Sequence, residues 1–227
     1  MEAGGMATDA SLVTPRTQML APQSLALGAG AGLAPKDGGE MLPLLRYGGD
    51  WDCDKTAMLN LAYQMERRTG SMLPIGSTTI QLDDARLTAL PFIFMSGHTD
   101  FRFTDREVER LRSYLRSGGY LWVNDSTDIG DEVFDQAARR ELGRVLDGVA
   151  WQPIPMHSDI FQAPYDLRNG YRGYAIPPGD KYRDDSLHGL YLEGRLAVVY
   201  TRNDYGDGLE IDPNTHPLMP SLSDLSP

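Results

Sequence analysis

The sequence predicts an α/β domain in which helices cover both faces of a parallel sheet. The continuous apolar run over residues 91–96 is typical of a strand that is buried on both faces, and YLWVND, over residues 120–125, is expected to be the next buried strand. The segment between them begins with a helix-capping pattern and then repeats apolar residues at helical spacing. Strand and helix patterns also alternate from residue 41 to residue 146, and this alternation favours parallel strands with crossover helices.

The first elements follow from local signals. Residues 41–47 are expected to form a strand, and a glycine pair ends it. A helix is expected over residues 55–69, with Asp54 as its N-cap and Gly70 at its end. Its apolar face repeats at positions i, i+3, i+4 and i+7, namely Met58, Leu61, Ala62 and Met65. A short strand is expected over residues 78–82.

The later elements are marked by caps, glycines and apolar periodicity. The sequence Thr104-Asp105-Arg106-Glu107 is a capping box that opens a second helix, which ends at Gly118-Gly119. A third helix is expected over residues 131–146. Residues 151–185 are rich in proline, glycine and tyrosine and are expected to form loops. The sequence LYLEGRLAVVY then predicts a β-hairpin that turns at Glu193-Gly194-Arg195.

Residues 1–40 differ from the rest in composition, being rich in alanine, glycine, proline, serine and threonine. Such a segment buries too little apolar surface to offset its ordering entropy. We therefore expect an arm that is disordered or bound to a partner, followed by one domain over residues 41–227. The arm is the expected route to protein partners or to self-association.

The net charge of −11 argues against nucleic acids and anionic membranes as partners, because both require clustered lysine and arginine. A single cysteine, Cys53, excludes an intrachain disulfide. No apolar run reaches the roughly 20 residues of a membrane helix, and no secretory signal is evident. The expected location is the cytoplasm.

Four stretches, LLRYGGDWDCD, PFIFMSGHTDFRFTDREVERLRSYLRSGGYLWVNDS, FDQAARRELGRVL and GRLAVVYTRNDYGDGLE, resemble the bacterial DUF4159 family in matching order over residues 41–212. The resemblance implies a class I glutamine-amidotransferase-like, flavodoxin-like fold near the trehalose-utilisation type, and it implies no particular reaction. Relatives continue with one more amphipathic helix, so the final helix is expected to be missing from this chain.

Polar residues follow two of the predicted strands at the sheet edge where ligands bind in open α/β folds. Active amidotransferases present a cysteine there, in a Gly-x-Cys-x-Gly turn after a strand. Residues 123–127 of this chain hold no cysteine, and Cys53 lies in an earlier loop. Glutaminase activity is therefore not expected.

Two chemical alternatives remain open at these strand ends. Ser126 is a candidate nucleophile with His98 as its base and Asp125 beside them, or it caps the following segment. The second alternative is a divalent metal ion held by oxygen and nitrogen ligands. The candidate metal ligands are His98, Asp100, Asp125 and Asp204, joined by His157 or Asp159.

The function expected from these observations is a non-catalytic binding or assembly module on an amidotransferase-like fold that lacks the nucleophilic cysteine. The alternative is a hydrolase or a divalent-metal-dependent enzyme with its site around His98, Asp125 and Ser126.

Overall fold

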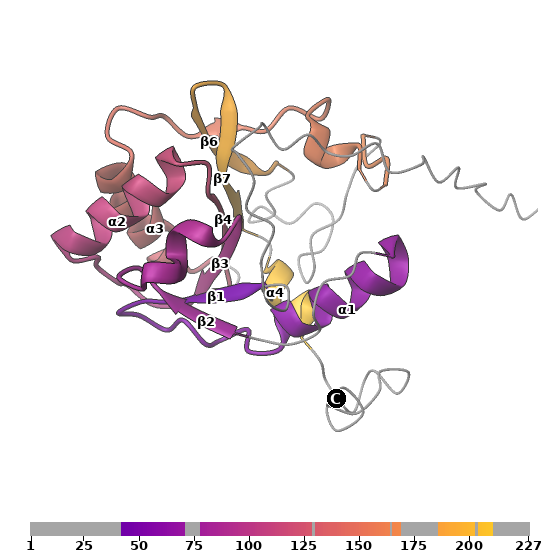
Figure 1. Ribbon diagram of the computed structural model, residues 1–227, viewed down its shortest axis with the longest axis horizontal. Coiled ribbons are helices and arrows are strands. Elements are labelled where there is room, and N and C mark those ends of the chain that lie inside the picture. Colours follow the sequence, from indigo (N-terminus) through magenta and orange to yellow (C-terminus); the bar gives the residue numbers. More distant parts are fainter. Residues whose placement is uncertain are drawn as a thin grey trace, which may run out of the picture.

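A seven-stranded sheet forms the centre of the computed structural model, which describes residues 42–70, 78–128, 130–163, 165–168, 186–202 and 204–210 (Figure 1). The strands are β1 (Pro43–Arg46), β2 (Thr78–Gln81), β3 (Phe92–Gly97), β4 (Tyr120–Asp125), β5 (Gln152–Pro153), β6 (His188–Leu192) and β7 (Arg195–Thr201). The α-helices are α1 (Ala57–Thr69), α2 (Asp105–Arg116), α3 (Val133–Val145) and α4 (Tyr205–Leu209), and the 3₁₀ helices are η1 (Ala85–Ala89) and η2 (Asp159–Phe161).

The strand order is β2-β1-β3-β4-β7-β6-β5. The first five strands in this order are parallel, and β6 and β5 are antiparallel additions at one edge. The parallel part has the strand order of a flavodoxin-like sheet, in which the chain runs outward in both directions from a switch point between the first and third strands. The predicted α/β class and the predicted hairpin β6–β7 are thus confirmed.

The helices cover opposite faces of the sheet, as Figure 1 shows with α2 and α3 on one side and α1 on the other. Side chains alternate between the two faces along each strand. Leu44 and Phe94 accordingly pack with Ala57 and Met58 of α1. Their strand neighbours join a larger core with α2 and α3, which includes Leu45, Ile93, Met95, Leu111, Leu121, Val123 and Ala138.

Several local predictions hold because their contacts span only a few residues. Thr104 and Glu107 form both hydrogen bonds of the capping box. Gly70 ends α1 in the left-handed conformation, with φ of 68°. The turn of the β6–β7 hairpin places Glu193 and Gly194 at φ of 50° and 82°, and positive φ at both turn residues matches the right-handed twist of the paired strands.

The prediction that Asp54 caps the first helix is wrong. Helix α1 begins at Ala57 with Thr56 at the N-cap position, and no side chain caps it. The side chain of Asp54 instead accepts a hydrogen bond from Ser126, beyond the end of β4. The third helix also begins later than expected, at Val133, because the Asp131 carboxylate accepts the backbone N–H of that residue from outside the helix.

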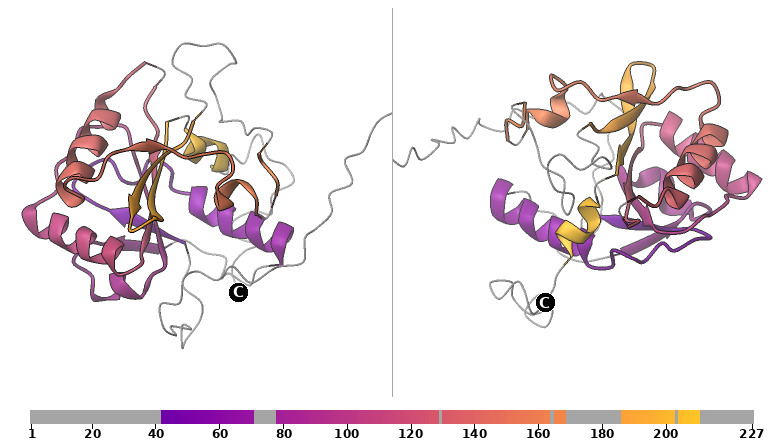
Figure 2. Two further views of the ribbon diagram at one scale, coloured as in Figure 1. Left: turned by 90° about the horizontal axis from the view of Figure 1, so that it is seen from above. Right: turned by 180° about the vertical axis from the view of Figure 1, so that it is seen from behind.

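Helix α4 lies against the N-terminal half of α1 in every view (Figure 2). Asn60 Nδ2 donates to the carbonyl of Leu209 at 2.7 Å, and Thr56 donates to Glu210 Oε1 from its backbone N–H at 3.2 Å. No helix within the described residues has the length and apolarity needed to cross a bilayer. The predicted arm and the end of the chain after residue 210 lie outside the described residues.

Candidate functional site

Strands β3 and β4 end side by side, with Gly97 opposite Asp125 and Ser96 opposite Asn124. The prediction that His98 and Asp125 follow neighbouring parallel strands to one sheet edge is therefore confirmed for the backbone. Side chains of consecutive residues point to opposite faces, however. Asn124 lies on the α1 face and Asp125 on the α2–α3 face, so the polar run after β4 is divided between two sites.

Asp125 is buried and its carboxylate is fully engaged on the α2–α3 face. Its Oδ2 accepts from Tyr200 OH at 2.9 Å, and its Oδ1 accepts from Thr127 Oγ1 at 2.6 Å and Thr127 N at 3.1 Å. Burial raises the pKa of Asp125, and the hydrogen bonds from Thr127 and Tyr200 offset part of that effect. These contacts make Asp125 a structural link between β4, β7 and the loop that follows β4.

The other predicted residues on the loop after β3 point elsewhere. His98 is exposed, and its Nδ1 lies 2.7 Å from Asp50 Oδ2, in the loop after β1. Asp100 is also exposed, and Arg140 Nη2 donates to it at 2.8 Å, so this hydrogen bond lowers the pKa of Asp100. His98, Asp100 and Asp125 thus contact three different partners and do not form a metal-ligand cluster among the described residues. In the part of the chain that the structure describes, His157 and Asp159 do not join such a cluster either.

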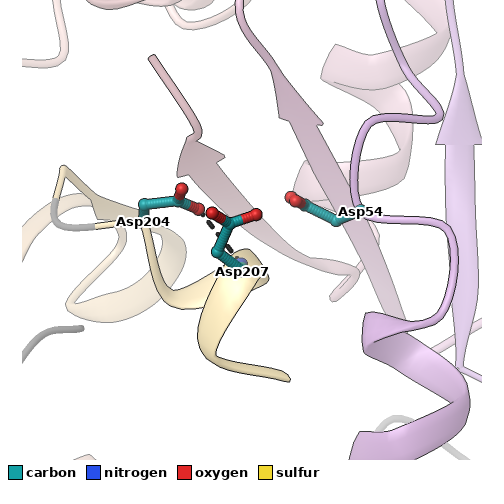
Figure 3. A group of neighbouring side chains, drawn as sticks. All are labelled: Asp54, Asp204 and Asp207. Carbon is teal, nitrogen blue, oxygen red and sulfur yellow. Dashed lines mark hydrogen bonds between the residues drawn. The ribbon is translucent and has the colours of Figure 1, made fainter. Parts of the chain in front are cut away.

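Asp204 does lie in a carboxylate cluster, together with Asp54 and Asp207. One carboxylate oxygen from each of these aspartates lies within 4.8 Å of the others, and we call the three residues the aspartate centre (Figure 3). Asp54 comes from the loop between β1 and α1, Asp204 precedes α4, and Asp207 belongs to α4. The centre therefore joins two chain segments at the carboxyl edge of the sheet.

Asn124 positions this centre from the end of β4. Its Oδ1 accepts from Thr201 Oγ1 at 2.8 Å and from the backbone N–H of Tyr205 at 2.9 Å. Because a backbone N–H can only donate, these contacts fix the orientation of the amide. The Nδ2 group consequently points at the aspartates, 3.3 Å from Asp204 Oδ1 and 3.4 Å from Asp54 Oδ2.

Ser126 is the second positioning residue of the aspartate centre. Its Oγ donates to Asp54 Oδ2 at 2.9 Å and accepts from Asn124 Nδ2 at 3.0 Å. Asp54 itself is only 1% exposed. Its Oδ1 is buried and has no hydrogen-bond partner within the described part of the chain. One oxygen of Asp54 is therefore held by the protein while the other has no donor.

The electrostatics of the centre favour the uptake of positive charge. Burial raises the pKa of Asp54; hydrogen bonding with Ser96 and Ser126 offsets part of this effect, and the charges of Asp207 and Glu210 add to it. Burial also raises the pKa of Asp204 to about 7, with contributions from the charges of Asp207 and Asp54. Within the described ranges, no lysine or arginine forms an ion pair with any of the three aspartates. Either a proton or a cation relieves the repulsion between these carboxylates.

Cys53 lies next to the centre without the properties of a nucleophile. Its thiol donates to Ser96 Oγ at 3.3 Å. Burial raises the pKa of the Cys53 thiol to about 12, and the charge of Asp54 adds to this shift. The thiolate is the reactive form of cysteine, so this environment disfavours the reactivity of Cys53.

The residues that sequence reasoning missed are Asp54, Asp207 and Asn124. Asp54 was assigned to helix capping, and the other two received no role. One signal for Asp207 is its spacing from Asp204, since residues three apart share a face of a helical turn. The sequence DYGDG also begins four positions after Tyr200, the last residue of the predicted hairpin. No local signal connects either residue to Asp54.

Comparison with known proteins places this chain in a family. No curated protein is significantly similar to it. The family model described as "Domain of unknown function (DUF4159)" matches residues 41–224, which include every residue of the aspartate centre and the whole described sheet. The chain therefore belongs to the DUF4159 family.

Proposed function

We propose that this protein is a non-catalytic binding or assembly module on an amidotransferase-like fold. The observation that supports the proposal is the hydrogen bonding of Ser126, which follows the strand after which the family resemblance would place an amidotransferase nucleophile. Its Oγ hydrogen atom is directed at Asp54, and its oxygen accepts from Asn124. A serine nucleophile needs a base that removes its proton and is itself oriented by a third group, and the described contacts of Ser126 include no histidine.

The backbone around Ser126 supports the same view. A nucleophile elbow holds its residue on a strained turn that leads directly into a helix. Among the described residues other than glycine, positive φ angles occur only at Glu193 and Asp204. Helix α3 begins seven positions after Ser126, at Val133. Ser126 thus lacks both the strain and the helix that present a nucleophile.

Activity assays test the absence of nucleophilic chemistry. We expect no ammonia release from glutamine and no hydrolysis of p-nitrophenyl acetate above the rate of a heat-denatured sample. Wild-type protein would be compared with Ser126→Ala and Cys53→Ser. Turnover that Ser126→Ala or Cys53→Ser abolishes while the variant remains folded would refute the proposal.

Light scattering tests the assembly role. The apolar residues Leu12, Met19, Leu20, Leu25 and Leu27 are scattered through the N-terminal 40 residues. A disordered segment with such anchors can wrap around a partner surface, and it loses its conformational entropy only when it binds. We expect the full chain to form an oligomer. The chain lacking residues 1–40 should remain folded but form an assembly of fewer chains, as judged by the measured mass divided by the mass of one chain. If both chains are monomeric, the arm does not mediate self-assembly.

A hydrolase is the second candidate function, and the pairing of His98 with Asp50 favours it. A carboxylate at Nδ1 orients the ring and leaves Nε2 as the base, which is the arrangement used in catalytic triads. Both residues lie in loops at the switch point between β1 and β3, where ligands bind in doubly wound sheets. Hydrolysis of a phosphate or carboxylate ester that His98→Ala abolishes, and that Asp50→Asn reduces, would favour this function over the binding module.

A further inference from the structure

We propose that Asp54, Asp204 and Asp207 bind one hard divalent cation, of the class of Mg²⁺, Ca²⁺ and Mn²⁺, at the carboxyl edge of the sheet. This proposal does not depend on the binding-module proposal, because a cation bound at this site could either stabilise the fold or take part in catalysis. It also differs from the ligand set expected from the sequence, of which only Asp204 remains.

The buried oxygen of Asp54 points to a ligand. Asp54 Oδ1 has no hydrogen-bond partner in the described part of the chain, although the residue is 1% exposed. A buried carboxylate oxygen without a donor or a cation carries a large desolvation cost. The side chain points toward Asp204 and Asp207, as Figure 3 shows. A cation between the three carboxylates would balance the charge of this buried side chain.

The spacing and chemistry of the ligand atoms fit a hard cation. The three oxygens lie within 4.8 Å of one another. Oxygens on opposite sides of Ca²⁺ lie up to about 5 Å apart, because Ca–O distances are about 2.3–2.6 Å. Mg²⁺ binds at about 2.0–2.1 Å and would draw the carboxylates closer while keeping several waters. Zn²⁺ favours nitrogen and sulfur ligands, and this centre offers only oxygen.

The surrounding hydrogen bonds orient the ligands as outer-shell groups do in metal sites. Ser126 and Asn124 both donate to Asp54 Oδ2, and these hydrogen bonds fix the orientation of the carboxylate. Asn124 also donates to Asp204 Oδ1. The exposure of Asp207 provides access for an ion from solvent.

Calorimetric titration of the metal-free full chain tests the site. The protein would be stripped with a chelator, desalted and titrated separately with MgCl₂, CaCl₂ and MnCl₂ at neutral pH. We expect one ion per chain for at least one of these salts, with a Kd between about 10⁻⁶ and 10⁻³ M. Asp54→Asn and Asp207→Asn should each weaken binding by at least about tenfold, because each removes a charged ligand.

Asp52→Asn is the matched control, since Asp52 lies two positions from Asp54 in the same loop but outside the centre. It should bind the ion within about twofold of wild type, because long-range effects of one exposed charge are screened. Should Asp54→Asn fail to fold, as judged by circular dichroism, the exposed Asp207→Asn decides the question. Absence of binding for all three ions overturns the proposal, as does wild-type affinity in Asp207→Asn.

Discussion

The backbone of Gly206 lies directly against the carboxylate of Asp54. A Cβ atom at Gly206 would lie 2.1 Å from Asp54 Oδ2 and 2.8 Å from Asn124 Nδ2, both far inside van der Waals contact. The absence of a side chain at this position therefore lets α4 approach the end of the sheet closely enough for Asp204 and Asp207 to meet Asp54. One glycine links the docking of a short helix to the assembly of the aspartate centre.

Gly206→Ala should destabilise the protein by about 1–3 kcal/mol, because an added methyl group in a tight site forces its neighbours to shift. Urea unfolding measures the change. Gly143→Ala is the matched control, since a Cβ at Gly143 in α3 would meet no atom within 4 Å. Alanine there should stabilise the protein by about 0.5–1 kcal/mol through its higher helix propensity. Equal stabilities of the two variants would contradict the close contact described above.

Asp125→Asn should change how stability depends on pH. Burial raises the pKa of Asp125 in the folded state above its ordinary value of 3.8, so the folded protein holds this proton more tightly than the unfolded chain. Ionisation of Asp125 therefore lowers the free energy of unfolding as the pH rises from about 4 through the folded pKa. At lower pH the carboxyl group is protonated and has no such effect. The asparagine variant cannot titrate, so its stability relative to wild type should increase with pH across this range.

Urea unfolding of wild type and Asp125→Asn between pH 4 and pH 7 checks this expectation. Asp128→Asn serves as the control, because Asp128 is an exposed aspartate in the same loop and its removal changes the net charge equally. A stability difference between Asp125→Asn and wild type that stays constant or falls with pH would show that the folded pKa of Asp125 is not raised.

Glu141→Gln should destabilise the protein by about 1–3 kcal/mol, the cost of disrupting hydrogen bonds to a buried charge. The Glu141 side chain is 0% exposed, and it accepts from Phe103 N at 3.1 Å and from Arg140 Nε at 2.8 Å. Arg144 is its third partner. Glutamine has an NH₂ group in place of one carboxylate oxygen, and this group would place N–H donors against the N–H donors of the protein. The variant thus leaves donors of α3 and of the segment before α2 without their partner.

Glu109→Gln is the comparison for this measurement, because Glu109 is an exposed residue of α2 that pairs with Arg112. Exposed ion pairs contribute about 0–1 kcal/mol, so this change should be small. Chemical denaturation of both variants gives the comparison. Equal losses of stability would mean that the burial of Glu141 contributes nothing to its effect.

Cys53→Ser should change the free energy of unfolding by less than about 1 kcal/mol and leave the molecular mass in solution unchanged. Serine keeps a donor for Ser96 Oγ, which the thiol contacts at 3.3 Å in a half-buried position. Exchanging one small polar group for another at such a position is usually well tolerated. Thermal unfolding and light scattering measure the two quantities. Loss of folding, or a change of mass, would show that Cys53 has a structural or intermolecular role.

The α/β class and the order of the main elements were predictable, because the signals for them are local or statistical. The run over residues 91–96 is apolar on both faces of a strand, which by itself indicates a strand covered on both sides. The capping box of Thr104 and Glu107 spans three residues, so its hydrogen bonds form wherever the helix forms. The adjacency of β3 and β4 follows from the short right-handed crossover through α2.

The composition of the candidate site depended on contacts between distant residues. Asp125 and Asn124 are neighbours in the sequence, yet the pleat of β4 directs them to opposite faces, so one becomes a structural link and the other a positioning residue of the aspartate centre. Asp54 reaches the centre because its loop returns across the end of the sheet, where Ser126 meets it. Local pattern alone identifies the polar residues at the strand ends. Which of them meet depends on strand register, on loop path and on the close approach that Gly206 allows, and these are properties of the folded chain.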